Sequence, residues 1–190
     1  MNNIVLGVLS SGTGTVFLAA AAAKSAFRVS IAPFLLAVGL PTSLASWMAR
    51  ATPVVEGLVG VLLLGAWLPS AALLASALSI GFFLALLQAY KNGVQEGCRC
   101  FGALDTDQLS GLSLVRTGLL VAATLVLSSG VVSAGISASL KITMSHDIVT
   151  TTVGTLLGIA FVGVFALLEQ VWWFEGQRPR TVPPPAVDTL

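Results

Sequence analysis

The sequence predicts an all-α, polytopic membrane protein with five membrane-spanning helices, the last of them near the C-terminus. Of the 190 residues, 56% are hydrophobic and only 9% are charged, whereas about a quarter of the residues of a soluble domain carry charge. The mean hydropathy is +0.96. A helix needs roughly 20 apolar residues to cross a bilayer, because its backbone must satisfy its own hydrogen bonds there, and the chain has room for five.

The charge balance bears on possible partners. Nine basic and eight acidic residues give a formal net charge of +1. Proteins that bind nucleic acids need clusters of Lys and Arg to neutralise phosphates, so no nucleic acid is expected as a partner. The expected surroundings are the lipid bilayer of a cell membrane.

The first span is expected at residues 4–23. No Lys or Arg precedes Lys24, whereas a secretory signal peptide begins with a basic segment, so we expect the span to be retained. Cleavage after the small residues at 19–23 is the alternative. A run of Ser, Gly and Thr at residues 10–15 predicts close packing against a neighbouring helix.

The stretch at residues 31–48 is short for a span and contains Pro33, Gly39 and Pro41. An interfacial or re-entrant helix is therefore favoured over a full crossing. The second span is expected to begin at Pro53, which suits a first turn, with Glu56 at the positive end of the helix dipole.

A hairpin turn at residues 68–70 is predicted to lead into a third span at residues 71–90, and a polar loop at residues 91–111 follows. The fourth span is expected at residues 113–132, with Arg116 in its opening turn. A cation there opposes the helix dipole, so Arg116 is expected to pair with a negative group.

A polar connection at residues 133–147 carries the single histidine, His146, and a fifth span is expected at residues 148–173. Gly154 and Gly158 in that span have the spacing of closely paired helices. The proline-containing tail at residues 175–190 is expected to be disordered. The chain thus divides into three parts: four spans with their connections at 1–132, a connection with a fifth helix at 133–174, and the tail at 175–190.

If residues 31–48 do not cross, Lys24, Glu56, the polar loop and Arg116 fall on one side of the membrane and His146 on the other. For Lys24 and Glu56, two interpretations compete. Lys24 snorkels and Glu56 caps its helix, or the two form an ion pair that links the first two spans.

The polar loop holds the only two cysteines, Cys98 and Cys100, with Arg99 between them. A disulfide between them closes no useful loop, so it would not staple the fold, and strained or exposed disulfides are the more oxidising ones. Arg99, with Arg116 and Lys91 within reach, would stabilise a thiolate and favour thiol exchange.

The cysteines have two other interpretations. A metal site would need further ligands, but the chain has no other cysteine and His146 is expected on the opposite side, so no metal is expected. Inert thiols that act only as small hydrophobic side chains are the second alternative.

The order of these motifs resembles the MauE family of methylamine utilisation proteins, a relative of the DoxX-type and DsbB- or VKOR-like membrane redox proteins. The Cys-x-Cys-Phe-Gly element is the most specific part, and the resemblance covers about residues 4–132. The matching elements are Ala23-Lys24, Leu40-Pro41, Pro53-x-x-Glu56-Gly57, Cys98-x-Cys100-Phe101-Gly102 and Arg116.

The resemblance implies a four-helix redox bundle that works with a thioredoxin-like or other cysteine-containing partner protein. In methylamine utilisation, the family member is linked to maturation of the disulfide-rich small subunit of methylamine dehydrogenase. The leading hypothesis is a membrane thiol:disulfide oxidoreductase that also exchanges electrons with a quinone or a second dithiol protein. Cys98 and Cys100 would be catalytic, supported by Arg99, Arg116, Lys24 and Glu56.

Two alternatives come from other classes. A non-enzymatic membrane assembly factor, or docking subunit, would hold a partner protein through its helices, with Gly154 and Gly158 as the docking face. A small-solute transporter would need inverted repeats or broken helices, of which the sequence has little.

The side of the membrane on which the cysteines lie is predicted differently by two criteria. All cations except Lys141 fall on the cysteine side, which by the positive-inside rule is the cytosol. Disulfide formation belongs outside the cytosol, and the family resemblance implies that side.

Overall fold

The computed structural model describes residues 3–26, 30–65, 68–94, 111–144 and 148–176. Within these ranges the chain is entirely helical, without a strand, and five of the helices are long and apolar enough to cross a membrane. The predicted all-α, polytopic fold is confirmed. The helices are α1 (Asn3–Ala26), α2 (Ala32–Ala37), α3 (Thr42–Leu64), α4 (Leu68–Lys91), α5 (Gly111–Met144) and α6 (Ile148–Gly176).

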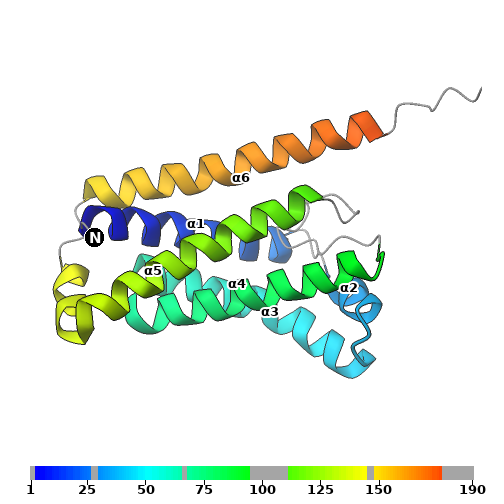
Figure 1. Ribbon diagram of the computed structural model, residues 1–190, viewed down its shortest axis with the longest axis horizontal. Helices are drawn as coiled ribbons and strands as arrows, with labels where there is room; N and C mark the ends of the chain where they lie inside the picture. Colours follow the sequence, from blue (N-terminus) through cyan, green and yellow to red (C-terminus); the bar gives the residue numbers. More distant parts are fainter. Residues whose placement is uncertain (1–2, 27–29, 66–67, 95–110, 145–147, 177–190) are drawn as a thin grey trace, which may run out of the picture.

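The five long helices run along the long axis of the molecule and alternate in direction (Figure 1). The end of α1, the short helix α2, the start of α3, the end of α4 and the start of α5 share one end. We call this the cysteine end, because the segment that contains the cysteines joins α4 to α5 there.

The stretch at residues 31–48 does not cross the bundle by itself, as predicted. Its first part is α2, whose six residues end in a turn where Gly39 has φ +98°, a conformation that favours glycine. The rest, from Thr42, already belongs to α3.

The expectation that Pro53 begins a helix is wrong, because Pro53 lies inside α3. Pro53 has no N–H for the carbonyl of Ala49, and the Thr52 hydroxyl donates a 2.7 Å hydrogen bond to the carbonyl of Met48. The helix continues through the proline, as membrane helices tolerate. Its first turns splay from the bundle (Figure 1).

The turn between α3 and α4 lies earlier than predicted. Gly65 caps α3 by donating its N–H to the carbonyl of Val61 over 2.7 Å, and α4 begins at Leu68. Residues 68–70 are therefore helical, and Pro69 occupies a first-turn position where its missing N–H costs little.

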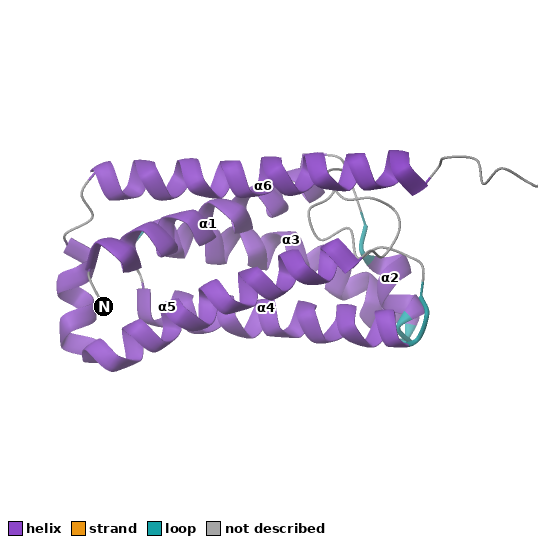
Figure 2. Ribbon diagram, turned by 45° about the horizontal axis from the view of Figure 1, so that its top comes forward, coloured by secondary structure: helices purple, strands orange, loops and turns teal. Residues whose placement is uncertain are grey.

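The predicted polar connection at residues 133–147 is helical as far as Met144, since α5 has 34 residues. A helix of that length spans about 51 Å, more than the roughly 30 Å of hydrocarbon. Its last turns bend away from the bundle direction (Figure 2). His146 lies outside the described residues, as does the tail beyond Gly176, the last residue of α6.

Helix α1 is the centre of the bundle and packs against α3 on one side and α6 on the other, while α4 packs against α5. The small residues at 10–15 make this close contact, as predicted. Ser10 donates a 2.9 Å hydrogen bond to the carbonyl of Leu63 on α3. A Cβ added at Gly14 of α1 would lie 3.1 Å from the carbonyl oxygen of Gly60, which is also on α3.

Gly154 and Gly158 of α6 pack directly against α1. A Cβ at Gly154 would lie 1.9 Å from the Ser11 hydroxyl, and one at Gly158 would lie 2.6 Å from the carbonyl oxygen of Gly12. The predicted close helix pairing is therefore formed within the chain, and the interpretation of these glycines as a docking face for a partner protein is wrong.

Candidate functional site

Lys24 of α1 and Glu56 of α3 form an ion pair in the interior of the bundle, with 2.5 Å between Nζ and Oε1. Only 3% of Lys24 and 2% of Glu56 is exposed. Glu56 lies about four turns into α3, so it does not cap that helix. Lys24 does not snorkel, because its ammonium group ends on the carboxylate. The ion pair is thus the correct one of the two interpretations.

A third helix reaches the same pair. The ring centroid of Phe82 on α4 lies 5.6 Å from Nζ of Lys24, which is within the range of a cation–π interaction. The ammonium group therefore connects α1 to both α3 and α4.

Beside the ion pair is a small cavity of about 20 Å³ between α1, α3, α4 and α5. Two buried polar atoms in its lining residues, Oε2 of Glu56 and Oγ of Ser79, have no hydrogen-bond partner in the described part of the chain. A cavity needs about 10–15 Å³ to hold one water-sized group. The space thus fits a single hydroxyl or water.

Arg116 is the third buried charge at the cysteine end, with 2% of the residue exposed. It lies in the second turn of α5 rather than in the opening turn, since the helix begins at Gly111. Its neighbour Thr117 lines the small cavity and donates a 2.8 Å hydrogen bond to the carbonyl of Ser113. Arg116 also has interactions within the protein, in keeping with the cost of an isolated charge at this depth.

The predicted catalytic residues Cys98 and Cys100, and Arg99 between them, lie in residues 95–110, outside the described residues. The chain on either side is described. Val94 donates its N–H to the carbonyl of Ala89 and packs against the core formed by α1, α2, α3 and α4. Because α5 starts at Gly111 at the same end, both attachments of the cysteine segment lie at the end of the bundle that holds the buried charges.

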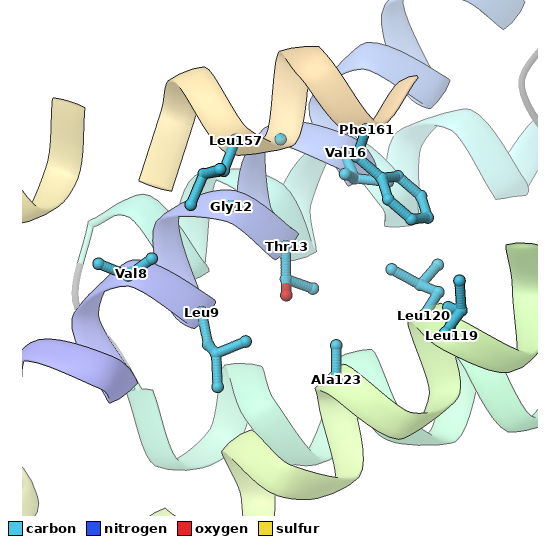
Figure 3. A pocket seen from close by; sticks show the side chains of 11 residues that line it. Val8, Leu9, Gly12, Thr13, Val16, Leu119, Leu120, Ala123, Leu157 and Phe161 are labelled. Carbon is cyan, nitrogen blue, oxygen red and sulfur yellow. The ribbon is translucent and has the colours of Figure 1, made fainter. Parts of the chain in front are cut away.

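A larger cavity of about 160 Å³ lies between α1, α5 and α6 (Figure 3). Its walls are almost entirely apolar, and the Thr13 hydroxyl points into it towards Ala123 (Figure 3). Val16 and Leu120 line both cavities, which are therefore adjacent.

The sequence did not single out Ser79, Phe82 or Thr117. The available signal was weak: Ser76 and Ser79 are one turn apart in an otherwise apolar span, and both prove to be buried. For metals, no group of three or more His, Cys, Asp and Glu residues that could hold an ion occurs among the described residues.

Comparison with known proteins identifies the family. No curated protein and no solved structure matches the chain. One family model, described as methylamine utilisation protein MauE, matches residues 2–130. With five candidate spans, the chain has the character of a multi-pass membrane protein, and the family description suggests a role in methylamine utilisation. Because the match covers more than half of its length, the chain belongs to the MauE family.

Proposed function

We propose that the protein is a membrane thiol:disulfide oxidoreductase in which Cys98 and Cys100 exchange a disulfide with a thioredoxin-like or other cysteine-containing partner protein. The observation that carries the proposal is the spacing of the only two cysteines in the chain, one residue apart, with Arg99 between them. Support comes from the flanking residues Val94 and Gly111, which attach this segment to the end of the bundle where Lys24, Glu56 and Arg116 are buried.

The exchange consists of two thiolate displacements. A partner thiolate attacks one sulfur of the Cys98–Cys100 disulfide, forms a mixed disulfide and releases the other sulfur as a thiolate. The second partner thiolate then attacks the mixed disulfide and displaces the remaining cysteine. The partner is left with a disulfide and the Cys98–Cys100 pair with two thiols, so two electrons have passed to the pair. The same steps in reverse would reduce the partner.

The other residues support this chemistry. Arg99 and Arg116 stabilise the thiolate that leaves or attacks, since a nearby cation favours the ionised sulfur. Lys24 and Glu56 hold α1 and α3 together at the end where the cysteine segment is attached.

One cysteine pair stores two electrons, so it needs a second redox partner to work repeatedly. A membrane quinone would accept two electrons and two protons from the dithiol and leave as a quinol, while the pair returns to the disulfide. A second protein with a disulfide could accept the two electrons and two protons instead, and would be left as a dithiol. Within methylamine utilisation, the proposed use is maturation of the disulfide-rich small subunit of methylamine dehydrogenase.

The test is the redox state of the partner's cysteines in cells that produce Cys98→Ser or Cys100→Ser variants. Each variant is expected to leave the partner reduced, and Cys100→Ser is expected to trap a mixed disulfide through Cys98. The control is Ser46→Ala, which changes an exposed serine near the start of α3. Normal oxidation of the partner in both cysteine variants would refute the proposal.

The second candidate is a non-enzymatic assembly factor, favoured by the outward face of α6. This face has no neighbour within the described chain and exposes Leu156, Ile159 and Leu167. On that hypothesis, alkylation of the thiols leaves partner maturation unchanged, whereas Leu167→Gln abolishes it. The oxidoreductase proposal expects the opposite pair of results.

A further inference from the structure

The two adjacent cavities have complementary properties. The larger one is apolar and holds about 160 Å³. The smaller one brings together two buried oxygens that lack hydrogen-bond partners in the described residues, Oε2 of Glu56 and Oγ of Ser79. We infer that together they form a binding site for a neutral, lipid-soluble molecule with a single ring that bears a hydroxyl group.

The size of the larger cavity selects the ring. An apolar cavity of about 150 Å³ in a protein core stays dry and binds benzene. The cavity between α1, α5 and α6 has nearly the same volume, so one six-membered ring fits. Empty, it would lose the dispersion contacts that a ring restores.

The smaller cavity selects the hydroxyl group. An ionised carboxylate oxygen only accepts hydrogen bonds, whereas a serine hydroxyl both donates and accepts. A ligand hydroxyl can therefore donate to Glu56 and accept from Ser79. A charged group is disfavoured, because Glu56 already has Lys24 as its counter-ion and a further charge at this depth is costly.

Val16 and Leu120 line both spaces, so the two cavities meet at these side chains. In the proposed pose, the ring lies in the larger space and its hydroxyl reaches past these two side chains into the smaller one. No group other than the hydroxyl has to leave the apolar cavity.

The ligand enters from the bilayer. Leu119 of α5 and Leu157 of α6 line the larger cavity and are 49% and 55% exposed, which puts the mouth of the cavity on the outer surface of the bundle. In the described part of the chain, α5 and α6 do not pack extensively against each other. A lipid-soluble molecule can therefore pass between them without crossing water.

The quinol form of the proposed quinone belongs to this ligand class, and that identification rests on the proposed function. The site itself does not need the cysteines. A water molecule offers the same hydroxyl chemistry as the ring, so the experiment must separate a ligand hydroxyl from a bound water.

The test uses the full chain in lipid nanodiscs with two probes, 4-fluorophenol and fluorobenzene, and ¹⁹F NMR to measure saturable binding above that of empty nanodiscs. The probes differ by one hydroxyl. Wild-type protein is expected to bind 4-fluorophenol about tenfold more tightly, as one to two net hydrogen bonds allow. Equal affinities, or no saturable binding of either probe, would overturn the inference.

Two variants locate the probe. Ser79→Ala is expected to remove most of the preference for 4-fluorophenol and to leave fluorobenzene unchanged. Ala123→Leu and Ala123→Phe fill the larger cavity in steps and are expected to weaken both probes progressively, with unfolding temperatures measured to confirm that each folds. If Ser79→Ala leaves the preference intact, the ligand hydroxyl does not lie against Ser79 in the smaller cavity and the inference fails.

Two controls complete the design. Ser128→Ala removes a buried hydroxyl of α5 that lines neither cavity and should change neither affinity. Thr13→Val removes the hydroxyl that faces the larger cavity (Figure 3); a lost preference for 4-fluorophenol in this variant would move the ligand hydroxyl to Thr13 and contradict the inference. The double variant Cys98→Ser, Cys100→Ser should bind both probes like the wild type. If the double variant still binds the probes, the binding site does not depend on the cysteines. The binding inference and the proposed redox function can then be refuted independently of each other.

Discussion

Lys24 on α1 and Glu56 on α3 are 32 positions apart in the sequence and meet as a buried ion pair at the cysteine end of the bundle. The pair joins the central helix to the helix whose early turns splay away after α2. Because Phe82 of α4 also lies against the ammonium group, three helices are fixed by one charged contact.

Removing one partner of this pair is expected to destabilise the protein strongly. Lys24→Met leaves the Glu56 carboxylate buried without its counter-ion, which costs about 3–5 kcal/mol of unfolding free energy. The double variant Lys24→Met, Glu56→Leu removes both charges and is expected to lose less than Lys24→Met alone. The measurement is the unfolding free energy in mixed micelles of detergent and SDS.

The matched control for the ion pair is Arg50→Gln, which changes an exposed cation on α3. Substitutions of this kind at the surface change the unfolding free energy by no more than about 0.5 kcal/mol. If Lys24→Met behaves like Arg50→Gln, the ion pair contributes nothing to the fold.

The glycines of α6 offer a second matched comparison. Gly158→Ala places a methyl group 2.6 Å from the carbonyl oxygen of Gly12, so α1 and α6 must separate, at a cost of about 1–3 kcal/mol. Gly163→Ala meets no atom within 4 Å and is expected to leave stability unchanged or slightly raised. If Gly158→Ala and Gly163→Ala have the same unfolding free energy, the contact between α1 and α6 is loose.

Much of this architecture follows from hydropathy, and the departures have physical causes. The number of spans and the common end of Lys24, Glu56 and Arg116 depend only on run lengths and parity, which the sequence displays. Pro53 was misplaced because in water a proline commonly marks a first turn, whereas a membrane helix continues through it.

With Pro53 as the first residue of a helix, Glu56 would lie in the first turn and could cap it. Because Pro53 lies inside α3, Glu56 lies inside it too, and it pairs with Lys24 instead. Ser79 was missed because a serine in an apolar span looks the same in the sequence whether it faces lipid or a cavity. Only the arrangement of four helices around it reveals the cavity.

The proposed chemistry predicts that Arg99 controls the reactivity of its neighbours. Arg99→Gln removes the adjacent positive charge, lowers the fraction of thiolate at neutral pH and should slow alkylation of the cysteines by iodoacetamide roughly three- to tenfold. The alkylation rate of Arg99→Gln should return to that of the wild type at a pH where the cysteine thiols of both proteins are fully ionised. Arg50→Gln serves as the control, and an unchanged rate in Arg99→Gln would show that the thiols do not depend on this charge.

The sidedness of the cysteines decides between two physical rules. Lys24, Arg50, Lys91 and Arg116 all lie on helices at or towards the cysteine end, which by the positive-inside rule favours the cytosol. Lys24 and Arg116 are buried within the bundle, however, and a cation held by internal contacts is a poorer topology signal than an exposed one.

The proposed function requires an oxidising compartment, so the cysteines are expected on the extracytoplasmic side. A membrane-impermeant maleimide should therefore label Cys98 and Cys100 in intact spheroplasts after reduction, and should fail to label them in sealed inside-out vesicles. A single cysteine introduced as Ser46→Cys, in the double Cys98→Ser, Cys100→Ser background, reports the same end of the bundle from an exposed position on α3. Labelling of these positions only in inside-out vesicles would put the pair in the reducing cytosol, where reduction of a partner disulfide, rather than its formation, is the reaction the same two sulfurs would favour.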